Sequence, residues 1–310
     1  MLYNNLSNYL KQRYGRKIKK ICIDGGFTCP NRDGTCGTGG CIFCGEEGAG
    51  EHIKFKEKSV TEQVLKFFEN GPKGDAFIAY FQNFTNTYAP VNILKQTYDA
   101  ALIDDRIVAL AIGTRPDCIT EEIAALLADY RKCCDVWVEL GLQTANDTTA
   151  EIINRGYKRE AFSEAVRILN QYQIPIVVHI IIGLPSEGDE DIIETVDFIN
   201  QFCLWGIKIH SIYVMKHTAL EKMYLAGKYA PPTMKQYVDR AIYVLTHIPP
   251  DMIVHRLTGD CPKGLLVAPD WNPQKNLVLQ SITQLMEMQG YRQGCLYSNL
   301  NIKKDIQWEK

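Results

Sequence analysis

The chain has 310 residues, of which 46% are hydrophobic and 23% are charged, an ordinary globular composition with enough length for a sizeable core. Lys and Arg number 34 against 36 Asp and Glu, and the net charge of −2 excludes a chromatin-type polycation but not a local basic face. No apolar run approaches about 18 residues, and the start lacks the charged and apolar parts of a secretory signal. We therefore expect a cytoplasmic protein without a membrane span.

The sequence contains 11 cysteines, an odd number in a chain that is too long and apolar to need disulfide staples. Reduced cytosolic thiols, some of them with a metal role, are therefore favoured over a disulfide framework. The positions of the cysteines decide which of them bind a metal.

Apolar runs and helical patterns alternate along most of the chain. Several runs are apolar throughout, which is typical of parallel strands buried on both faces. The alternation predicts parallel βα units with right-handed crossovers, in a full or partial barrel or an open doubly wound sheet, with the active site at the carboxyl ends of the strands. Strands are predicted at 19–24, 76–81, 107–112, 136–140, 174–182 and 207–215, and helices at 60–69, 91–102, 120–130, 160–172 and 189–202.

The pattern becomes less regular after about residue 225, where an Ala-Pro-Pro run interrupts it. We predict a core with an N-terminal basic segment over residues 1–225, followed by a C-terminal extension over 226–310 that packs on the barrel. Within the extension, a helix is predicted at 233–246, a strand at 252–257 and a second helix at 274–289.

Three cysteines follow the first predicted strand in a C-x11-C-x2-C pattern, Cys29, Cys41 and Cys44, with Phe43 just before the last. Thiolates suit both iron–sulfur clusters and zinc. A structural zinc site would recruit Cys36 as a fourth ligand, because closed zinc sites want four. A 4Fe-4S cluster would use three cysteines and leave one iron open, and Cys36 would then be a spare thiol in an exposed loop.

The cysteine loop directly after strand one of a βα barrel resembles the radical S-adenosylmethionine superfamily. The usual spacing there is C-x3-C-x2-C, and the longer first gap with an aromatic residue before the last cysteine is typical of the Elongator-like branch. Segments 25–34 and 79–90 look like radical enzymes of the YhcC/YtqA family, relatives of Elongator's catalytic subunit. The resemblance is close over residues 20–90 and continues more loosely to about 275.

This resemblance implies an α/β fold, a partial (β/α)6 TIM-like barrel of the radical SAM type with a short C-terminal α/β extension. It implies a 4Fe-4S cluster on Cys29, Cys41 and Cys44 and S-adenosyl-L-methionine as second cofactor. The open iron would bind the amino and carboxylate groups of the methionyl part, and electron transfer would release a 5′-deoxyadenosyl radical that abstracts hydrogen from the substrate. The other cysteines show no clamp spacing, so we predict no auxiliary cluster.

Polar residues near the predicted strand ends are the candidate cofactor contacts. The superfamily's Gly-Gly-Glu after strand two is absent here, and Gln82 and Asn83 are the candidates for holding the methionyl amine. The alternative is that they form a polar strand end that hydrogen-bonds its own turn. Glu139 and Gln143 match a Glu-Leu-Gly-Val-Gln segment of the family. Because burying an unpaired carboxylate is costly, we expect both to face the barrel mouth and bind ribose or substrate.

Further matches lie down the chain. Arg155 stands where related enzymes have an arginine for the methionyl carboxylate, a task that suits a planar guanidinium, and its alternative is a solvated helix end. His179 stands where a polar residue contacts adenosine, although a lone histidine in an apolar strand is more often a core residue. Gly183 resembles a turn whose backbone contacts adenine.

A segment near residue 255 supplies weak catalytic candidates. The segment resembles one of the family, and on this resemblance we expect Arg256 and Asp260 to face substrate and Cys261 to donate or accept a hydrogen atom. A surface turn with an incidental thiol is an equally good interpretation of this segment.

Residues 11–20 hold six basic residues and no acidic one. Such a segment beside the active-site loop fits a phosphate-backbone partner, although the same charges also suit a solvated helix. The resemblance points to tRNA, since YtqA-type members are associated with the wobble uridine, where a carboxymethylaminomethyl group becomes aminomethyl. It also implies an electron donor such as flavodoxin or ferredoxin.

Two alternatives stay open at this point. One is a radical SAM enzyme acting on a small molecule such as a porphyrinogen, which would have no affinity for RNA. The other is a non-enzymatic zinc-containing RNA-binding module, whose site would need Cys36.

Overall fold

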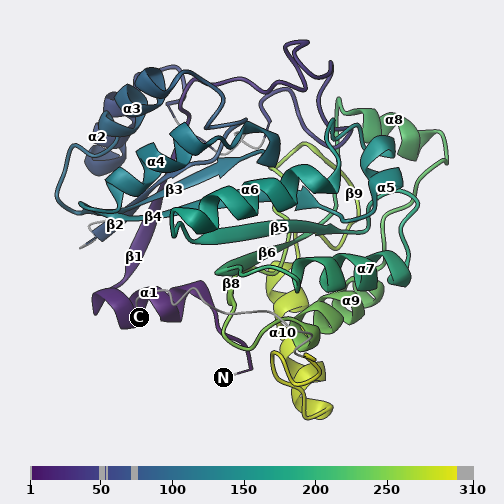
Figure 1. The fold of residues 1–310 in the computed structure, drawn as a ribbon. Helices are drawn as coiled ribbons and strands as arrows, with labels where there is room; N and C mark the ends of the chain where they lie inside the picture. Colours follow the sequence, from purple (N-terminus) through teal and green to yellow (C-terminus); the bar gives the residue numbers. More distant parts are fainter. Residues whose placement is uncertain (1, 49–52, 54, 71–75, 299–310) are drawn as a thin grey trace.

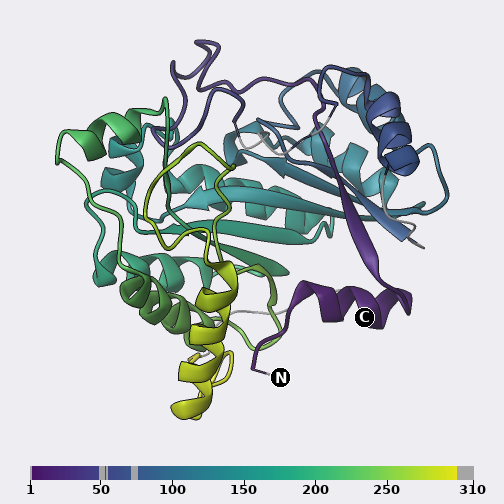
Figure 2. The same ribbon diagram turned by 180° about the vertical axis from the view of Figure 1, so that it is seen from behind.

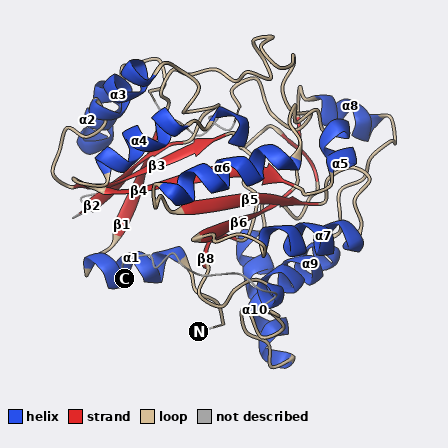
Figure 3. Ribbon diagram, in the orientation of Figure 1, coloured by secondary structure: helices blue, strands red, loops and turns tan. Residues whose placement is uncertain are grey.

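The computed structural model describes residues 2–48, 53, 55–70 and 76–298. Within them, seven parallel strands form one curled sheet, a half-barrel with the order β1-β2-β3-β4-β5-β6-β8 (Figures 1 and 3). The predicted partial barrel is thus confirmed, with β1 and β8 as its edges. The strands are β1 (Ile18–Ile23), β2 (Ala76–Phe81), β3 (Ile107–Thr114), β4 (Asp135–Gln143), β5 (Ile176–Ile182), β6 (Gly206–Ser211) and β8 (Ile253–Arg256).

Helices between the strands cover the convex face of the sheet (Figure 1). The sequence predicts these helices because each has an apolar face at helical spacing, and α4 also begins where the capping residue predicts. The Thr120 side chain accepts a hydrogen bond from the Ile123 N–H, and two glutamates follow in the first turn. The helices are α2 (Val60–Asn70), α3 (Val91–Asp99), α4 (Glu121–Tyr130), α6 (Arg159–Gln171) and α7 (Asp189–Ile199).

Both faces of the sheet are buried, as the continuous apolar runs predict. On the convex face, Phe81 of β2 packs edge-on against Tyr98 of α3, with ring centroids 5.3 Å apart. On the concave face, a second apolar layer lies at the amino ends of the strands and is covered by helix α1 (Leu6–Tyr14). The members of this layer are Leu6, Leu10, Ile78, Tyr80, Ala109, Ala111, Trp137, Val177, Trp205 and Ile253.

The basic segment 11–20 runs through the end of α1 and the start of β1, so it lies at the amino end of the barrel. The cysteine loop follows the other end of β1, and Figure 2 shows α1 and this loop at opposite ends of the molecule. The expectation that the segment lies beside the active-site loop is therefore wrong, because a whole strand separates the two. Within the segment, Arg13 bonds Asp135 at 2.6 Å and Lys20 faces the barrel interior.

The C-terminal part combines a strand of the main sheet with peripheral elements. The predicted strand at 252–257 is β8, which pairs with β6 and also bonds the N-terminal segment, the Val254 N–H donating to the Asn4 carbonyl at 2.7 Å. The extension boundary at 225 stays a prediction, and residues 299–310 of that extension lie outside the described residues. The peripheral elements are α8 (Ala219–Leu225), α9 (Met234–His247), β9 (Leu266–Ala268) and α10 (Lys275–Met288).

One predicted strand is divided. The apolar run 207–215 is β6 followed by a separate strand β7 (Val214–Met215), which pairs antiparallel with β9 in a small second sheet. The apolar pattern also misses three short elements. These are the 3-10 helix η1 (Pro116–Cys118), helix α5 (Asp147–Ile152) and strand β9.

All 11 cysteines lie in the described part of the chain, and none of them forms a disulfide there. In that same part, no helix has the length and apolar character needed to cross a membrane.

Candidate active-site cavity

A cavity of about 600 Å³ lies inside the half-barrel, a size suited to a cofactor or substrate. Every strand of the main sheet contributes to its wall, and the cysteine loop lies over its mouth at the carboxyl ends of the strands. Leu6 of α1 reaches the cavity from the opposite end, so the apolar layer on α1 closes its floor. Cysteine loop, wall and floor thus surround one interior space.

Cys29, Cys41 and Cys44 all line this cavity. A tight turn brings the last two together, since the Cys44 N–H donates to the Cys41 carbonyl at 3.0 Å. The Cys41 thiol is hydrogen-bonded to Cys44, and this contact together with burial raises the pKa of Cys41. Cys36, by contrast, is exposed and is not part of the cavity wall.

Within the described residues, no group of three or more His, Cys, Asp or Glu side chains has the arrangement of a metal site. The chemistry of the donor set nevertheless fits an iron–sulfur cluster, because three thiols from one loop open onto one enclosed space. It fits closed zinc coordination less well, since a fourth ligand is needed and Cys36 is exposed and not part of the cavity wall.

Arg115, which follows β3, connects the cysteine loop to the barrel. It forms a two-point ion pair with Asp117 and donates to the Arg155 carbonyl at 2.9 Å. Its guanidinium also lies 4.0 Å from the Cys29 sulfur and 3.6 Å from the Cys36 sulfur. This side chain lines the cavity and positions the loop, a role that the sequence analysis did not identify.

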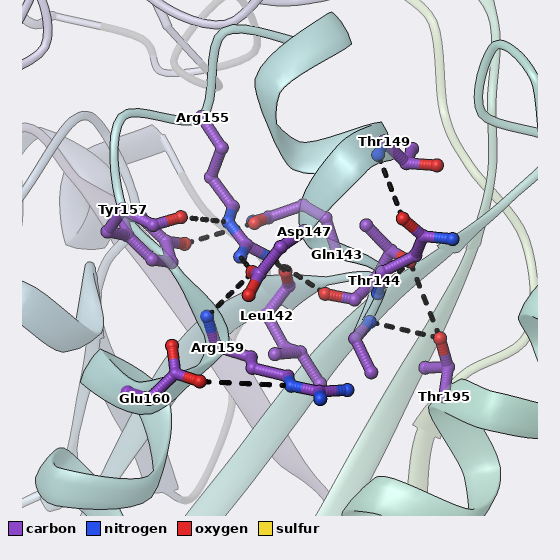
Figure 4. A network of polar contacts seen from close by, with 12 residues as sticks. Leu142, Gln143, Thr144, Asp147, Thr149, Arg155, Tyr157, Arg159, Glu160 and Thr195 are labelled. Carbon is purple, nitrogen blue, oxygen red and sulfur yellow. Dashed lines mark hydrogen bonds and ion pairs between the residues drawn. The ribbon is translucent and has the colours of Figure 1, made fainter.

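Arg155 lies behind the cavity wall instead of in it. Its guanidinium, with no exposed surface, donates to the carbonyls of Leu142 and Thr144 at 2.6 and 2.7 Å and pairs with Asp147 at 3.2 Å (Figure 4). The Arg155 Nε atom donates to the Tyr157 carbonyl at 2.9 Å. The guanidinium is thus committed to the backbone after β4, and the structure does not bring it to the cavity.

Of the polar residues at the strand ends, some line the cavity and others lie behind its wall. Gln82 and Gln143 line the cavity, and Gln143 accepts a hydrogen bond from the Tyr157 hydroxyl at 3.0 Å. Asn83 is buried beside the wall, where its amide donates to Asp24 at 2.6 Å.

Gly183 ends β5 in a turn outside the cavity wall. Its φ of +98° and the 2.6 Å that would separate an added Cβ from Pro232 leave room only for glycine. Its carbonyl accepts from the Tyr229 hydroxyl at 2.6 Å. The turn therefore packs against the C-terminal part, while His179 of the same strand lines the cavity.

Glu139, in the middle of β4, is fully buried and bonded on both oxygens. One oxygen accepts from Lys208 of β6 and lies 3.0 Å from His179 Nε2, and the other accepts from Trp137 Nε1 at 3.2 Å. Lys20 of β1 stands 3.9 Å away. Burial alone would raise the pKa of Glu139, but Lys208, Lys20 and the His179 hydrogen bond hold it well below its usual value.

Lys208 is the partner that makes this burial possible. Its ammonium also donates to the Tyr80 hydroxyl at 2.9 Å and lies 4.5 Å from the centre of that ring. Burial lowers the pKa of Lys208 to about 7, although Glu139 acts in the opposite direction.

Three histidines complete this layer of the wall. Burial lowers the pKa of His179 to about 4, with the nearby Lys208 adding to the effect. Burial also lowers the pKa values of His210 and His255 well below the usual value. All three are therefore neutral imidazoles at physiological pH.

Of the three catalytic candidates near residue 255, two line the cavity and one does not. Arg256 and Asp260 line the cavity, and Asp260 forms an ion pair with Lys275 of α10. Cys261 is not part of the wall, and its N–H donates to Asn272 at 3.4 Å.

Several wall residues have no counterpart among the sequence candidates. Lys208 and His210 alternate with isoleucines along β6, and this polar alternation within an apolar strand is the signal that could have found them. The inward-facing residues in this group are Lys20, Tyr80, Lys208, His210 and His255.

The protonation of Glu187, just after the Gly183 turn, affects the stability of the folded chain. Burial raises its pKa to about 7 from 4.5, so the folded chain keeps a proton that the unfolded chain releases between these values. Stability therefore falls as pH rises through this window. We expect Glu187→Gln to raise the free energy of unfolding by about 2 kcal/mol at pH 8 and hardly at all at pH 4. Urea denaturation at the two pH values checks this, and an equal gain at both would contradict it.

Comparisons with known proteins identify the family. The Radical SAM superfamily matches residues 32–199, and the Radical_SAM C-terminal domain matches residues 204–288. The protein YtqA of Bacillus subtilis is 38% identical over 301 residues, covering 96% of this chain and 94% of that protein. YhcC of Escherichia coli is 35% identical over 271 residues, with 87% of each chain covered. The chain therefore belongs to the radical SAM superfamily of enzymes and is similar to YtqA and YhcC.

More distant matches include the Elongator-like branch. The solved structure of the archaeal Methanocaldococcus infernus Elp3 has a TM-score of 0.64 and 17% identity, covering 89% of this chain and 64% of that one, which shows a shared fold. A tRNA uridine(34) acetyltransferase of Dehalococcoides mccartyi is 26% identical over 195 residues, covering 62% of this chain and 41% of that protein.

Proposed function

We propose that this chain holds a 4Fe-4S cluster on Cys29, Cys41 and Cys44, binds S-adenosyl-L-methionine in the cavity, and converts the carboxymethylaminomethyl side chain of the tRNA wobble uridine to aminomethyl. The observation that carries the proposal is that these three thiols open onto one cavity of about 600 Å³ with a closed apolar floor. Such a space can hold a reactive species away from water while one substrate group enters from the mouth.

The bound cluster and S-adenosyl-L-methionine would supply a 5′-deoxyadenosyl radical. The chain itself orients the cofactor and excludes water. Gln82, Gln143 and His179 stand in the wall as its direct contacts. Three other candidates support the wall from behind. Asn83 bonds Asp24, Arg155 bonds the backbone after β4, and Gly183 accepts from Tyr229.

Relatives support tRNA as the substrate. A tRNA uridine(34) acetyltransferase shares sequence with this chain, and the archaeal Elp3 shares its fold. Segment 11–20 presents Lys11, Arg16 and Lys17 on the surface of the barrel's amino end, where they would contact RNA beyond the anticodon. The electron would come from a flavodoxin or ferredoxin in the cytoplasm, where the cysteines stay reduced.

Nucleoside analysis by mass spectrometry tests this function. Reconstituted protein with S-adenosyl-L-methionine and reduced flavodoxin is incubated with tRNA that carries 5-carboxymethylaminomethyluridine at the wobble position. We expect 5-aminomethyluridine and 5′-deoxyadenosine to appear together, and neither with a Cys41→Ala variant. Formation of 5′-deoxyadenosine without any change in the tRNA would rule out this substrate and favour a small molecule.

A further inference from the structure

The inner layer of the cavity carries more positive than negative charge. Lys20 of β1, Lys208 of β6 and Arg256 of β8 all line it, and the Glu139 carboxylate in the same layer pairs with the two lysines. Asp260, nearer the C-terminal part, is already paired with Lys275. Three cations against one carboxylate leave a surplus that an anionic ligand would neutralise.

Arg256 is the cation without a protein partner. Within the described residues its guanidinium has no hydrogen bond and no ion pair, although it is close enough to lower the pKa values of His179 and Lys208. Lys20 lies 3.9 Å from Glu139 and 4.7 Å from the centre of the Tyr80 ring. These contacts orient the ammonium and still leave donor positions for a ligand.

Two histidines of the same layer keep polar atoms for a ligand. His255 has a fully buried side chain, and neither ring nitrogen has a hydrogen-bond partner in the described part of the chain. The Nε2 atom of His210 is also unpartnered there. Buried polar atoms are normally satisfied, so these point to a bound group or ordered water in the cavity.

The position of the layer selects the kind of anion. It lies between the cysteine loop and the apolar floor, with Lys208 buried in the barrel and Arg256 exposed on the edge strand β8. A backbone phosphate of folded RNA stays at the mouth, whereas a flexible side chain with a terminal carboxylate can extend inward. A guanidinium and two ammonium groups match such a carboxylate through charge-assisted hydrogen bonds.

We propose that Lys20, Lys208 and Arg256 form a carboxylate-binding subsite for the substrate, with the neutral imidazole of His255 as an additional donor. The assignment of this carboxylate to the carboxymethylaminomethyl group rests on the proposed function. The subsite then holds the end of the group that is removed and presents its methylene carbon to the space between the charged layer and the cysteine loop. Loss of a hydrogen atom and one electron from this carbon, with S-adenosyl-L-methionine as the oxidant overall, would give an imine, and its hydrolysis by water would release glyoxylate and leave the aminomethyl group.

Calorimetric titration of reconstituted holoenzyme tests the subsite without RNA. The probe is N-benzylglycine, an aryl-methyl-amino-methyl carboxylate, and its neutral match is N-benzylglycinamide. We expect the acid to bind at least about 10-fold more tightly than the amide, as one or two charge-assisted hydrogen bonds would give. Arg256→Gln and Lys20→Gln should each remove most of this preference. Arg167→Gln, on the outer face of α6 beside Glu164, is the matched control and should keep it.

The titration is repeated with saturating S-adenosyl-L-methionine, and thermal unfolding confirms that the variants fold. Equal binding of acid and amide, or a preference that survives both Arg256→Gln and Lys20→Gln, would overturn the subsite. Loss of the probe on adding S-adenosyl-L-methionine would assign the cations to the methionyl carboxylate and overturn it as well. An intact preference combined with unmodified tRNA would keep the subsite and refute the proposed tRNA reaction.

Discussion

Replacing Cys44 with alanine is expected to reduce formation of 5′-deoxyadenosine to less than about one thousandth of the wild-type rate. Cys44 lines the cavity together with Cys29 and Cys41, and its thiol is hydrogen-bonded to that of Cys41, so its removal takes away one of three donors. A cluster held at two points would lose iron on purification. Iron content per chain and the rate of S-adenosyl-L-methionine cleavage by reconstituted protein are the measurements.

The matched control is Cys36→Ala, which removes a thiol from the same loop. Cys36 is exposed and absent from the cavity wall, so we expect iron content and cleavage rate to stay near wild type. Electron paramagnetic resonance of the reduced protein, with and without S-adenosyl-L-methionine, shows whether the cofactor binds to the cluster. A silent protein that carries one zinc and loses it in Cys36→Ala would contradict the cluster and support the zinc module.

Parallel strands are the part of this fold that the sequence predicts best. All six residues of β2 are buried, and a strand covered on both faces has few polar residues to obscure its pattern. The edge strand β8 is predicted as a strand, but its place in the main sheet is not. Strand pairing joins residues far apart in the chain, as in the register of Gly206 with Ile253, and local composition carries no information on it.

The short peripheral elements show a second limit. The apolar run 207–215 reads as one strand, although the chain leaves the main sheet after Ser211 and pairs with β9 from Val214. Both halves are buried, so hydrophobicity is the same on either side of the bend. Only the tertiary surroundings distinguish them.

The sequence predicts site residues where a polar side chain interrupts an apolar strand, and it misses charged residues that resemble ordinary surface residues. Glu139 and His179 both interrupt apolar strands, and the structure places their side chains 3.0 Å apart. Lys20 belongs to a basic run and therefore resembles a surface residue, yet the curl of the sheet turns it inward. Arg155 illustrates the reverse, because its guanidinium is bonded to backbone carbonyls behind the wall, whereas Arg115, which the sequence analysis did not identify, lines the cavity.

Replacing Lys208 with methionine is expected to lower the free energy of unfolding by about 3–5 kcal/mol at pH 7. The substitution retains most of the side-chain volume but leaves the fully buried Glu139 carboxylate without its nearest cation. Lys20 at 3.9 Å and the neutral His179 compensate only in part. Urea denaturation of the purified chain, with the slope compared between variants, measures the loss.

The double variant Glu139→Gln with Lys208→Met separates charge from packing. A neutral amide can keep the Trp137 hydrogen bond without a buried charge, so we expect most of the lost stability to return. The pH dependence has a definite sign. Removing Lys208 raises the pKa of Glu139, so acid neutralises the carboxylate in the variant before it does so in the wild type, where that pKa is held low. The deficit of the single variant should therefore shrink as pH falls. A deficit that persists in the double variant and at low pH would mean that the contacts of the Lys208 ammonium with Tyr80, and not its pairing with the Glu139 charge, stabilise this layer.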